Sequence, residues 1–276
     1  MFINLFNYCK IIFIGMLMGI ANIIPGVSGG TIAVVTGVYD NLIESISQFL
    51  TASFKDKRKY SIFLLQIIFG AGISIILLSK LIDNAFKHYN YQILFFFIGL
   101  IIGSIPLLLK ENKIILTISN YKKILSLLWF MIGLVIPMLL IFLPESNYDN
   151  NSMIYLSVSG FIAAAAMILP GLSGSLMFLI LGTYKPIITA INDLNFILIF
   201  NVAIGGIFGL ITLSRLINYC IKNFVQYSYC FIIGLMIGSC INIWPGIPQT
   251  NTLFLFVLLM ISCLGIIVGM NLDRLK

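Results

Sequence analysis

Two short proline-glycine-serine breaks, each inside an apolar run, constrain the fold of this chain more than any other feature. The first is Pro25-Gly26-Val27-Ser28-Gly29-Gly30, and the second is Pro170-Gly171-Leu172-Ser173-Gly174-Ser175. Proline removes a backbone donor and prevents the preceding turn from continuing as regular helix. The glycines let the chain bend, and serine is a good N-cap for a helix that begins again. Each break therefore predicts a helix interrupted in the middle of a hydrophobic segment.

The two breaks belong to a longer repeat. Aligning Gly15–Tyr39 with Gly160–Tyr184, an offset of 145 residues, gives 9 identities in 25 positions. Two further segments repeat at an offset of 135 residues: Ile76–Ile82 with Ile211–Ile217, and Ile98–Ser104 with Ile233–Ser239. We therefore predict a tandem duplication within a single membrane domain, with repeat one at 8–143 and repeat two at 153–272. Transporter folds are often built this way.

Composition fixes the class of protein. The chain has 276 residues, of which 60% are hydrophobic and 9% charged, with a mean hydropathy of +1.09. A soluble domain cannot hide that much apolar surface, so the chain is predicted to be an integral membrane protein. The net charge of +7 is assigned to membrane topology rather than to nucleic acid, because the basic residues lie in short loops between apolar runs. The five cysteines show no CxxC spacing, and the single histidine, His88, is expected in a loop, so no metal site is predicted.

The apolar runs predict an all-α polytopic fold. Ile11–Ile24 and Gly29–Tyr39 flank the first break and are shorter than the roughly 20 residues that span a bilayer, so each is interpreted as a half-helix. Six longer runs predict three transmembrane helices per repeat: Ser61–Ser79, Ile93–Leu109 and Ile124–Leu143, then Phe196–Ser214, Tyr229–Pro245 and Leu253–Met270. Each repeat is thus a broken or re-entrant helical hairpin plus three transmembrane helices.

The positive charges favour hairpins that return to their own side of the membrane. In that arrangement 13 of the 16 Lys and Arg residues share one face, and only Lys80, Lys87 and Lys185 lie opposite. If each broken pair crosses once, the bias disappears. Because membrane proteins keep Lys and Arg in cytoplasmic loops, we predict returning hairpins, cytoplasmic termini and inverted repeats. Two full crossings per pair would give the same distribution, so only the short lengths favour re-entry.

The breaks predict a site for an anion. Non-helical backbone at membrane depth is tolerated only when it is buried in protein or lines a wet cavity, so the two hairpin tips are expected to meet. The free N–H groups of residues 29–31 and 174–176 would then point into that cavity, and a helix N-terminus favours anions, phosphate especially. Four residues add hydroxyl donors: Ser28, Thr31, Ser173 and Ser175. The alternative is that glycine and serine only permit close helix packing; the repetition of the break in register favours the site.

Other residues are open to two interpretations. Lys80 and Arg215 are expected to end matching helices on opposite faces. Singly, each is typical of a snorkelling anchor; as a symmetric pair they are candidates to receive an anionic headgroup at either face. Asn22 is either an interhelical hydrogen-bond partner or cavity lining. Three glycine pairs with small-xxx-small spacing predict helix packing: Gly99/Gly103, Gly234/Gly238 and Gly265/Gly269.

At these residues the chain resembles a known family. Gly19-x-Ala21-x-x-x-Pro25-Gly26-Val27-Ser28-Gly29-Gly30-Thr31, followed by Gly37-x-Tyr39, is similar to a signature of the bacterial polyprenyl-phosphate transporters. Leu169–Ser175 with Gly182-x-Tyr184 resembles the second signature, and Gly238-Ser239 with Trp244-Pro245 resembles a late one. The resemblance covers essentially the whole chain. It implies a flippase of the bacterial cell membrane that returns undecaprenyl phosphate from the outer to the inner leaflet for cell-wall synthesis.

The resemblance and the breaks together give a set of candidate residues and partners. The expected partners are a polyprenyl-phosphate lipid, membrane lipids and a coupling ion, either a proton or sodium; no cofactor and no metal are expected. Members of the family often carry an acid where this chain has Asn22. The candidate substrate-binding residues are Asn22, Pro25, Gly26, Ser28, Gly29, Gly30, Thr31, Tyr39, Lys80, Pro170, Gly171, Ser173, Gly174, Ser175, Tyr184 and Arg215.

Two other functions remain open. Membrane polyprenyl-pyrophosphate phosphatases also have inverted repeats and a Pro-Gly-x-Ser tip, but they need an arginine after that serine and a glutamate cluster. Here Gly29 and Gly174 follow the serines, and no glutamate lies deep in an apolar run, so an enzyme is not expected. An anion channel is the second alternative, although two gated hairpins suit alternating access better.

Overall fold

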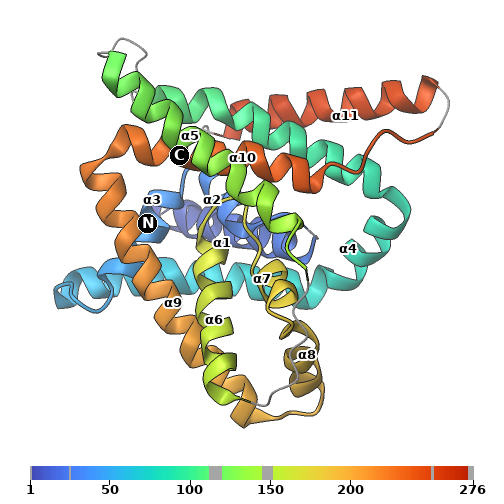
Figure 1. Cartoon of the computed structure of the whole chain (residues 1–276). Coiled ribbons are helices and arrows are strands. Elements are labelled where there is room, and N and C mark those ends of the chain that lie inside the picture. The colour runs from blue at the N-terminus through green and yellow to red at the C-terminus, as the bar shows by residue number, and fades with distance from the viewer. Residues whose placement is uncertain (1, 25, 112–119, 145–151, 250–251, 273–276) are drawn as a thin grey trace.

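The computed structural model describes residues 2–24, 26–111, 120–144, 152–249 and 252–272, and in these ranges the chain is helical with no strand (Figure 1). The first half contains α1 (Phe2–Ile23), α2 (Gly29–Val35), α3 (Tyr39–Gln48), α4 (Phe54–Glu111) and α5 (Asn120–Ile141). The second half contains α6 (Met153–Ile168), α7 (Gly174–Ile180), α8 (Tyr184–Asn192), α9 (Phe196–Asn223), α10 (Val225–Ile243) and α11 (Thr252–Asn271).

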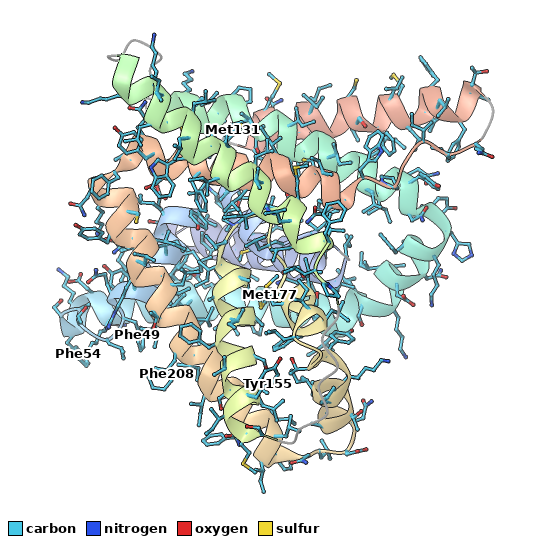
Figure 2. The ribbon with its side chains drawn as sticks, viewed as in Figure 1. Phe49, Phe54, Met131, Tyr155, Met177 and Phe208 are labelled. Atoms are coloured by element: carbon cyan, nitrogen blue, oxygen red, sulfur yellow. The ribbon has the colours of Figure 1, made fainter. Side chains whose placement is uncertain are left out.

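Within the described ranges, five helices are long and apolar enough to cross a membrane, namely α4, α5, α9, α10 and α11, or six spans if the bent pair α7 and α8 counts as one. The apolar part of α1 and the whole of α6 are shorter, and the short helices α7 and α8 meet at 111°. Large apolar side chains are exposed along the outer faces of the long helices, for example Phe208 on α9, whereas Met177 is buried beside α6 (Figure 2). A belt of exposed apolar side chains is what lipid contact requires, and the all-α polytopic membrane fold is therefore confirmed.

The backbone repeats the same local geometry in both halves. Gly26 and Gly171 have φ of +82° and +83°, and Gly37 and Gly182 have φ of +69° and +68°. Only glycine adopts this left-handed region at little cost, which explains its presence at both ends of each short helix. The prediction of an interrupted helix that begins again after the serine is confirmed, because Ser28 and Ser173 are the N-caps of α2 and α7.

The long helix α4 corrects the expected element boundaries. Its two apolar runs lie on two helices that meet at a kink at Tyr89, where the backbone is non-helical, and helical structure extends beyond each apolar run to that kink. The equivalent residue 135 positions later, Phe224, has nearly the same φ and separates α9 from α10. Lys80 and Arg215 therefore lie inside helices rather than at their ends, and His88 is helical rather than in a loop. Polar residues in this stretch end the hydrophobic run, but they do not end the helix, because lysine, arginine and aspartate tolerate helical backbone.

Glycine faces join the two halves. The helix α11 packs on the second part of α4, and α10 packs on α5, so each contact links one repeat with the other (Figure 1). A Cβ at Gly99 or Gly103 would collide with the backbone of α11 at Ser262 or Ile266, and a Cβ at Gly234 would collide with Phe130 on α5. The remaining glycines at this spacing make the same kind of contact, so the prediction of close small-xxx-small packing is confirmed.

Candidate functional site: two hairpin tips and a polar latch

The two hairpin tips are in direct contact, as predicted. The N–H group of Gly171 at the second tip donates a hydrogen bond to Oγ1 of Thr31 at the first tip, with a length of 2.8 Å. Thr31 is buried, and a Cβ at Gly30 would lie 3.0 Å from the carbonyl oxygens of Met167 and Ile168 at the end of α6. One backbone donor of the second break is therefore satisfied by the first break, and the two breaks pack against each other, as irregular backbone in a membrane requires.

At the first tip, the backbone N–H groups of residues 29–31 are all hydrogen-bonded. Asn22 on α1 accepts a hydrogen bond from the N–H of Gly29 through its Oδ1, at 2.8 Å. Ser28 Oγ accepts from the N–H of Gly30 at 3.2 Å, and the Ser28 carbonyl accepts from the N–H of Thr31 at 3.0 Å. The prediction of free N–H groups at residues 29–31 is therefore wrong in this conformation, because an amide side chain from the preceding helix reaches across the break.

The second tip differs from the first in its amide hydrogen bonding. The residue equivalent to Asn22 is Met167, which has no strong acceptor, and its side chain lies against Gly174. Within the described part of the chain, the N–H groups of residues 174–176 have no hydrogen-bond partner. The hydroxyl groups of Ser173 and Ser175 lie 2.7 Å apart. Ser175 is exposed and Ser173 partly exposed, whereas Gly174 is buried against Met167. Unpaired amides and hydroxyls of this kind suit an anionic oxygen ligand.

The remaining candidate residues differ in how exposed they are and in what they contact. Tyr39 is 3% exposed, and its hydroxyl has no partner among the described residues, whereas the equivalent Tyr184 is 38% exposed. Pro170 is buried and Gly26 is partly buried. Pro25 lies outside the described residues. Lys80 is exposed on α4, and Arg215 donates to a backbone carbonyl oxygen at the end of α3.

Polar contacts from α3 hold the first hairpin against the second repeat. Tyr229 Oη donates to Asp40 at 2.6 Å, and Lys222 Nζ forms an ion pair with Glu44 at 2.8 Å. Arg215 Nε donates to the carbonyl oxygen of Ser47 at 3.3 Å. We call these three contacts the α3 latch. They link α3 with α9 and α10, and α3 packs along α9 beneath them.

Among the residues that the structure describes, the second hairpin has no equivalent of the α3 latch. Its helix α8 packs on α7 and α9 of its own repeat. The positions equivalent to Asp40 and Glu44 are Lys185 and Thr189, both exposed, and neither is an acid. Lys87, the counterpart of Lys222, is paired within its own helix with Asp83.

Sequence reasoning did not find the latch. The sequence shows that α3 is amphipathic, but Asp40 and Tyr229 are 189 residues apart, and nothing in the local pattern connects them. The available signal was the difference between the repeats, since two acids in the first hairpin are replaced by a lysine and a threonine in the second.

These features define a polytopic all-α membrane protein with two mutually dependent broken helices. The chain belongs to a family described as undecaprenyl phosphate translocase-like, whose model matches residues 18–255. It is 33% identical over 251 residues to a polyprenyl-phosphate transporter of Vibrio cholerae, covering 87% of this chain and 78% of that one. It is 34% identical over 278 residues to a polyprenyl-phosphate transporter of Staphylococcus aureus, covering 95% and 94%. A comparison with solved structures finds no significant match.

The contact between the tips gives a stability prediction. Thr31→Val keeps the side-chain shape but removes the acceptor for Gly171, and a buried unpaired N–H costs about 1–3 kcal/mol. We expect a lower melting temperature for the purified protein in detergent, measured by intrinsic fluorescence. Thr31→Ser is the matched control, because it keeps the hydroxyl and should lose less. Equal melting of Thr31→Val and Thr31→Ser would show that this hydrogen bond does not hold the tips together.

Proposed function

We propose that this protein is a flippase that carries a polyprenyl phosphate from the outer to the inner leaflet of the bacterial cell membrane by alternating access. The support is that both named relatives are polyprenyl-phosphate transporters and align over most of the chain. The described tips supply amide and hydroxyl donors but no cation. A phosphate headgroup would be held by these donors, while the prenyl chain stays in lipid.

The difference between the two tips is the observation that carries this mechanism. The first tip has its amides occupied and its hairpin bound to the second repeat by the α3 latch, whereas the second tip has an exposed serine and unoccupied donors. An alternating-access carrier has one gate shut and the other open around a shared site. We assign this conformation to the state that accepts substrate at the second hairpin. Release would follow when the second tip closes and Asn22 leaves Gly29, which frees the amides of the first tip.

The proposed topology assigns each gate to one side of the membrane. With inverted repeats and cytoplasmic termini, the α3 latch closes the cytoplasmic gate and α8 borders the outer one. The long helix α4 supports this arrangement, because it runs out to Tyr89 and doubles back, so that its two ends lie on one side of the molecule (Figure 1). Lys55 and Lys110 are then near the same face, in accord with the charge bias. Loading from the outer leaflet follows directly from an open outer gate.

A lipid phosphatase and an anion channel are the rival functions. Glycine follows the serine at both tips, and in the described chain no group of three or more His, Cys, Asp or Glu residues is placed to bind a metal. Phosphoryl transfer relies on such positioned charge or metal, so we favour transport. The purified protein should release no phosphate from undecaprenyl pyrophosphate, and chloride flux in liposomes should match empty liposomes.

Leaflet-resolved transport tests the function. Proteoliposomes are prepared with a short-chain polyprenyl phosphate, and its appearance in the opposite leaflet is followed with an impermeant phosphate-binding reagent. Ser173→Ala with Ser175→Ala removes two hydroxyl donors from the open tip, and we expect transport at limiting substrate to fall by about tenfold. The loss should be smaller at saturating substrate, because the change weakens binding.

The matched control is Ser159→Ala on α6, whose hydroxyl is bonded within its own helix to the carbonyl oxygen of Leu156. It should transport at the parent rate. If the double serine variant also transports at the parent rate with equal incorporation, the phosphate does not bind at the second tip. If the parent protein moves no lipid phosphate, the proposed function itself is wrong.

The α3 latch predicts which charges control access to the first tip. In a background without native cysteines, Ser28→Cys is buried and should react slowly with an impermeant maleimide applied to the cytoplasmic side. Lys222→Glu places two carboxylates together and should increase the labelling rate by about two- to fivefold, the scale expected for an exposed ion pair. Adding Glu44→Lys restores opposite charges and should return the rate toward the parent value.

Lys87→Glu is the control, since Lys87 occupies the equivalent position in α4 but pairs only with Asp83 four residues away. It should leave labelling at residue 28 unchanged. Failure of the double charge reversal to restore slow labelling, with all variants folded, would exclude an electrostatic latch.

The topology can be tested with two positions at opposite ends of the first part of α4. Lys55 and His88 are both exposed and are separated by about 50 Å of helix. In intact cells, we expect His88→Cys to react with an impermeant thiol reagent and Lys55→Cys to react only after permeabilisation. The reverse pattern would invert the proposed orientation and assign the α3 latch to the outer gate.

A further inference from the structure

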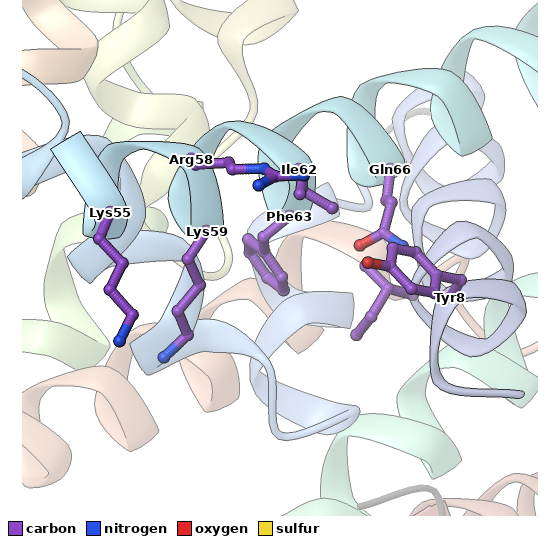
Figure 3. Close-up of a pocket in the computed structure, with 8 residues that line it drawn as sticks. Tyr8, Lys55, Arg58, Lys59, Ile62, Phe63 and Gln66 are labelled. Carbon is purple, nitrogen blue, oxygen red and sulfur yellow. The ribbon is translucent and has the colours of Figure 1, made fainter. Parts of the chain in front are cut away.

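A basic cavity lies where the first turns of α4 face the first repeat's opening helix, α1. Its volume is about 440 Å³, and Lys55, Arg58 and Lys59 line one wall. Tyr8 on α1 and Phe63 on α4 contribute aromatic surface to the lining. Figure 3 shows Lys55 and Lys59 extending in parallel from α4, with Phe63 beyond them and Tyr8 close to Gln66.

The three cations of the wall are not neutralised by the protein. Among the described residues, no acid forms an ion pair with Lys55, Arg58 or Lys59. The one acid in this turn, Asp56, does not line the cavity and is bonded to the hydroxyl of Ser53 at 2.6 Å. The spacing of three and four residues places the cations on one helix face. Lys55 also lies in the first turn of α4, where the helix dipole disfavours positive charge, so a bound anion would relieve both repulsions.

The cavity is also amphipathic and lies at the level where the apolar segments begin. The hydrophobic runs of α1 and α4 start at Ile11 and Ile62, and both residues contribute to its lining. A lysine or arginine at such a boundary has its charge in the headgroup region and its stem against the acyl region. A small soluble anion needs only the charged wall, whereas a lipid with an anionic head also uses the apolar one.

We propose that this cavity binds the phosphate headgroup of an anionic membrane lipid, with the first part of the acyl chain against Phe63 and Ile62. The basic wall supplies the charge that the headgroup requires, and basic pockets beside transmembrane helices commonly hold such lipids. The site is separate from the hairpin tips, whose residues do not line it. It holds whether or not the protein transports a polyprenyl phosphate.

Native mass spectrometry of the purified full chain in detergent tests the proposal. Phosphatidylglycerol is titrated against phosphatidylcholine of the same chain length, and we expect the parent protein to retain the anionic lipid preferentially. Removing two charges with Arg58→Gln and Lys59→Gln should reduce the fraction of lipid-bound protein by about tenfold or more at equal lipid. Lys57→Gln removes the same charge from a neighbouring residue that does not line the cavity, and it should bind lipid like the parent.

The controls distinguish a lipid site from a destabilised variant and from a soluble-anion site. The double variant must melt like the parent; if it does not, the two single variants, Arg58→Gln and Lys59→Gln, are compared with Lys57→Gln instead. Equal binding of phosphatidylglycerol by the cavity variants and the parent would overturn the proposal, as would equal retention of phosphatidylcholine. The last control adds inorganic phosphate at millimolar concentration as a competitor. Complete displacement of the lipid would identify a soluble-anion site and overturn the lipid assignment. Retention of the lipid supports the assignment.

Discussion

A helix that breaks inside a bilayer leaves backbone donors that lipid cannot satisfy, and the structure depends on how this chain resolves that problem. Each break is covered by the other. The hydrogen bond from the Gly171 N–H to Thr31 Oγ1, together with the approach of Gly30 to the end of α6, joins them at the backbone. Neither hairpin can therefore move freely without disturbing its partner. This dependence couples two hairpins that belong to different halves of the chain, and the glycine-faced packing of α4 on α11 and of α10 on α5 joins the helices of those halves.

The local geometry of the breaks was predictable because it depends on neighbouring residues only. A proline, a glycine and a capping serine specify a bend and a new helix start wherever they occur, and the matching φ values of Gly26 and Gly171 confirm this. The packing role of the paired glycines was predictable for the same reason. The helix boundaries near Lys80 and Arg215 were not, since hydropathy reports which residues favour lipid and not which residues are helical. The first part of α4 stays helical through polar residues that no apolar run includes, as far as the kink at Tyr89.

Whether the amides of each tip are hydrogen-bonded could not be predicted from the sequence, because it depends on one side chain that reaches across the break. Asn22 and Met167 occupy equivalent positions, yet only the amide can accept the hydrogen bond that closes Gly29. In a symmetric pair of tips, the sequence predicts two equal sets of free amides. The structure instead has one satisfied set and one unsatisfied set. An acid at residue 22, which the resemblance associates with other members, would keep the acceptor and add a titratable charge at the point where the first tip closes.

The α3 latch extends this asymmetry from the tips to the helices that follow them, and in the proposed transport cycle these helices form the gates. A perfectly repeated protein would have no intrinsic preference between its two closed states, because each contact would have an equal counterpart. Here Asp40 and Glu44 bind Tyr229 and Lys222, while their counterparts Lys185 and Thr189 would face Leu94 and Lys87 if the second gate closed in the same way. Lysine facing leucine forms no ion pair, and threonine facing lysine offers only a neutral acceptor. Closing the second gate in this way would therefore lack the ion pair and the tyrosine–carboxylate hydrogen bond of the α3 latch. Under the proposed transport cycle, the free carrier rests with its first gate shut, and phosphate binding at the second tip supplies the interaction that the missing latch does not.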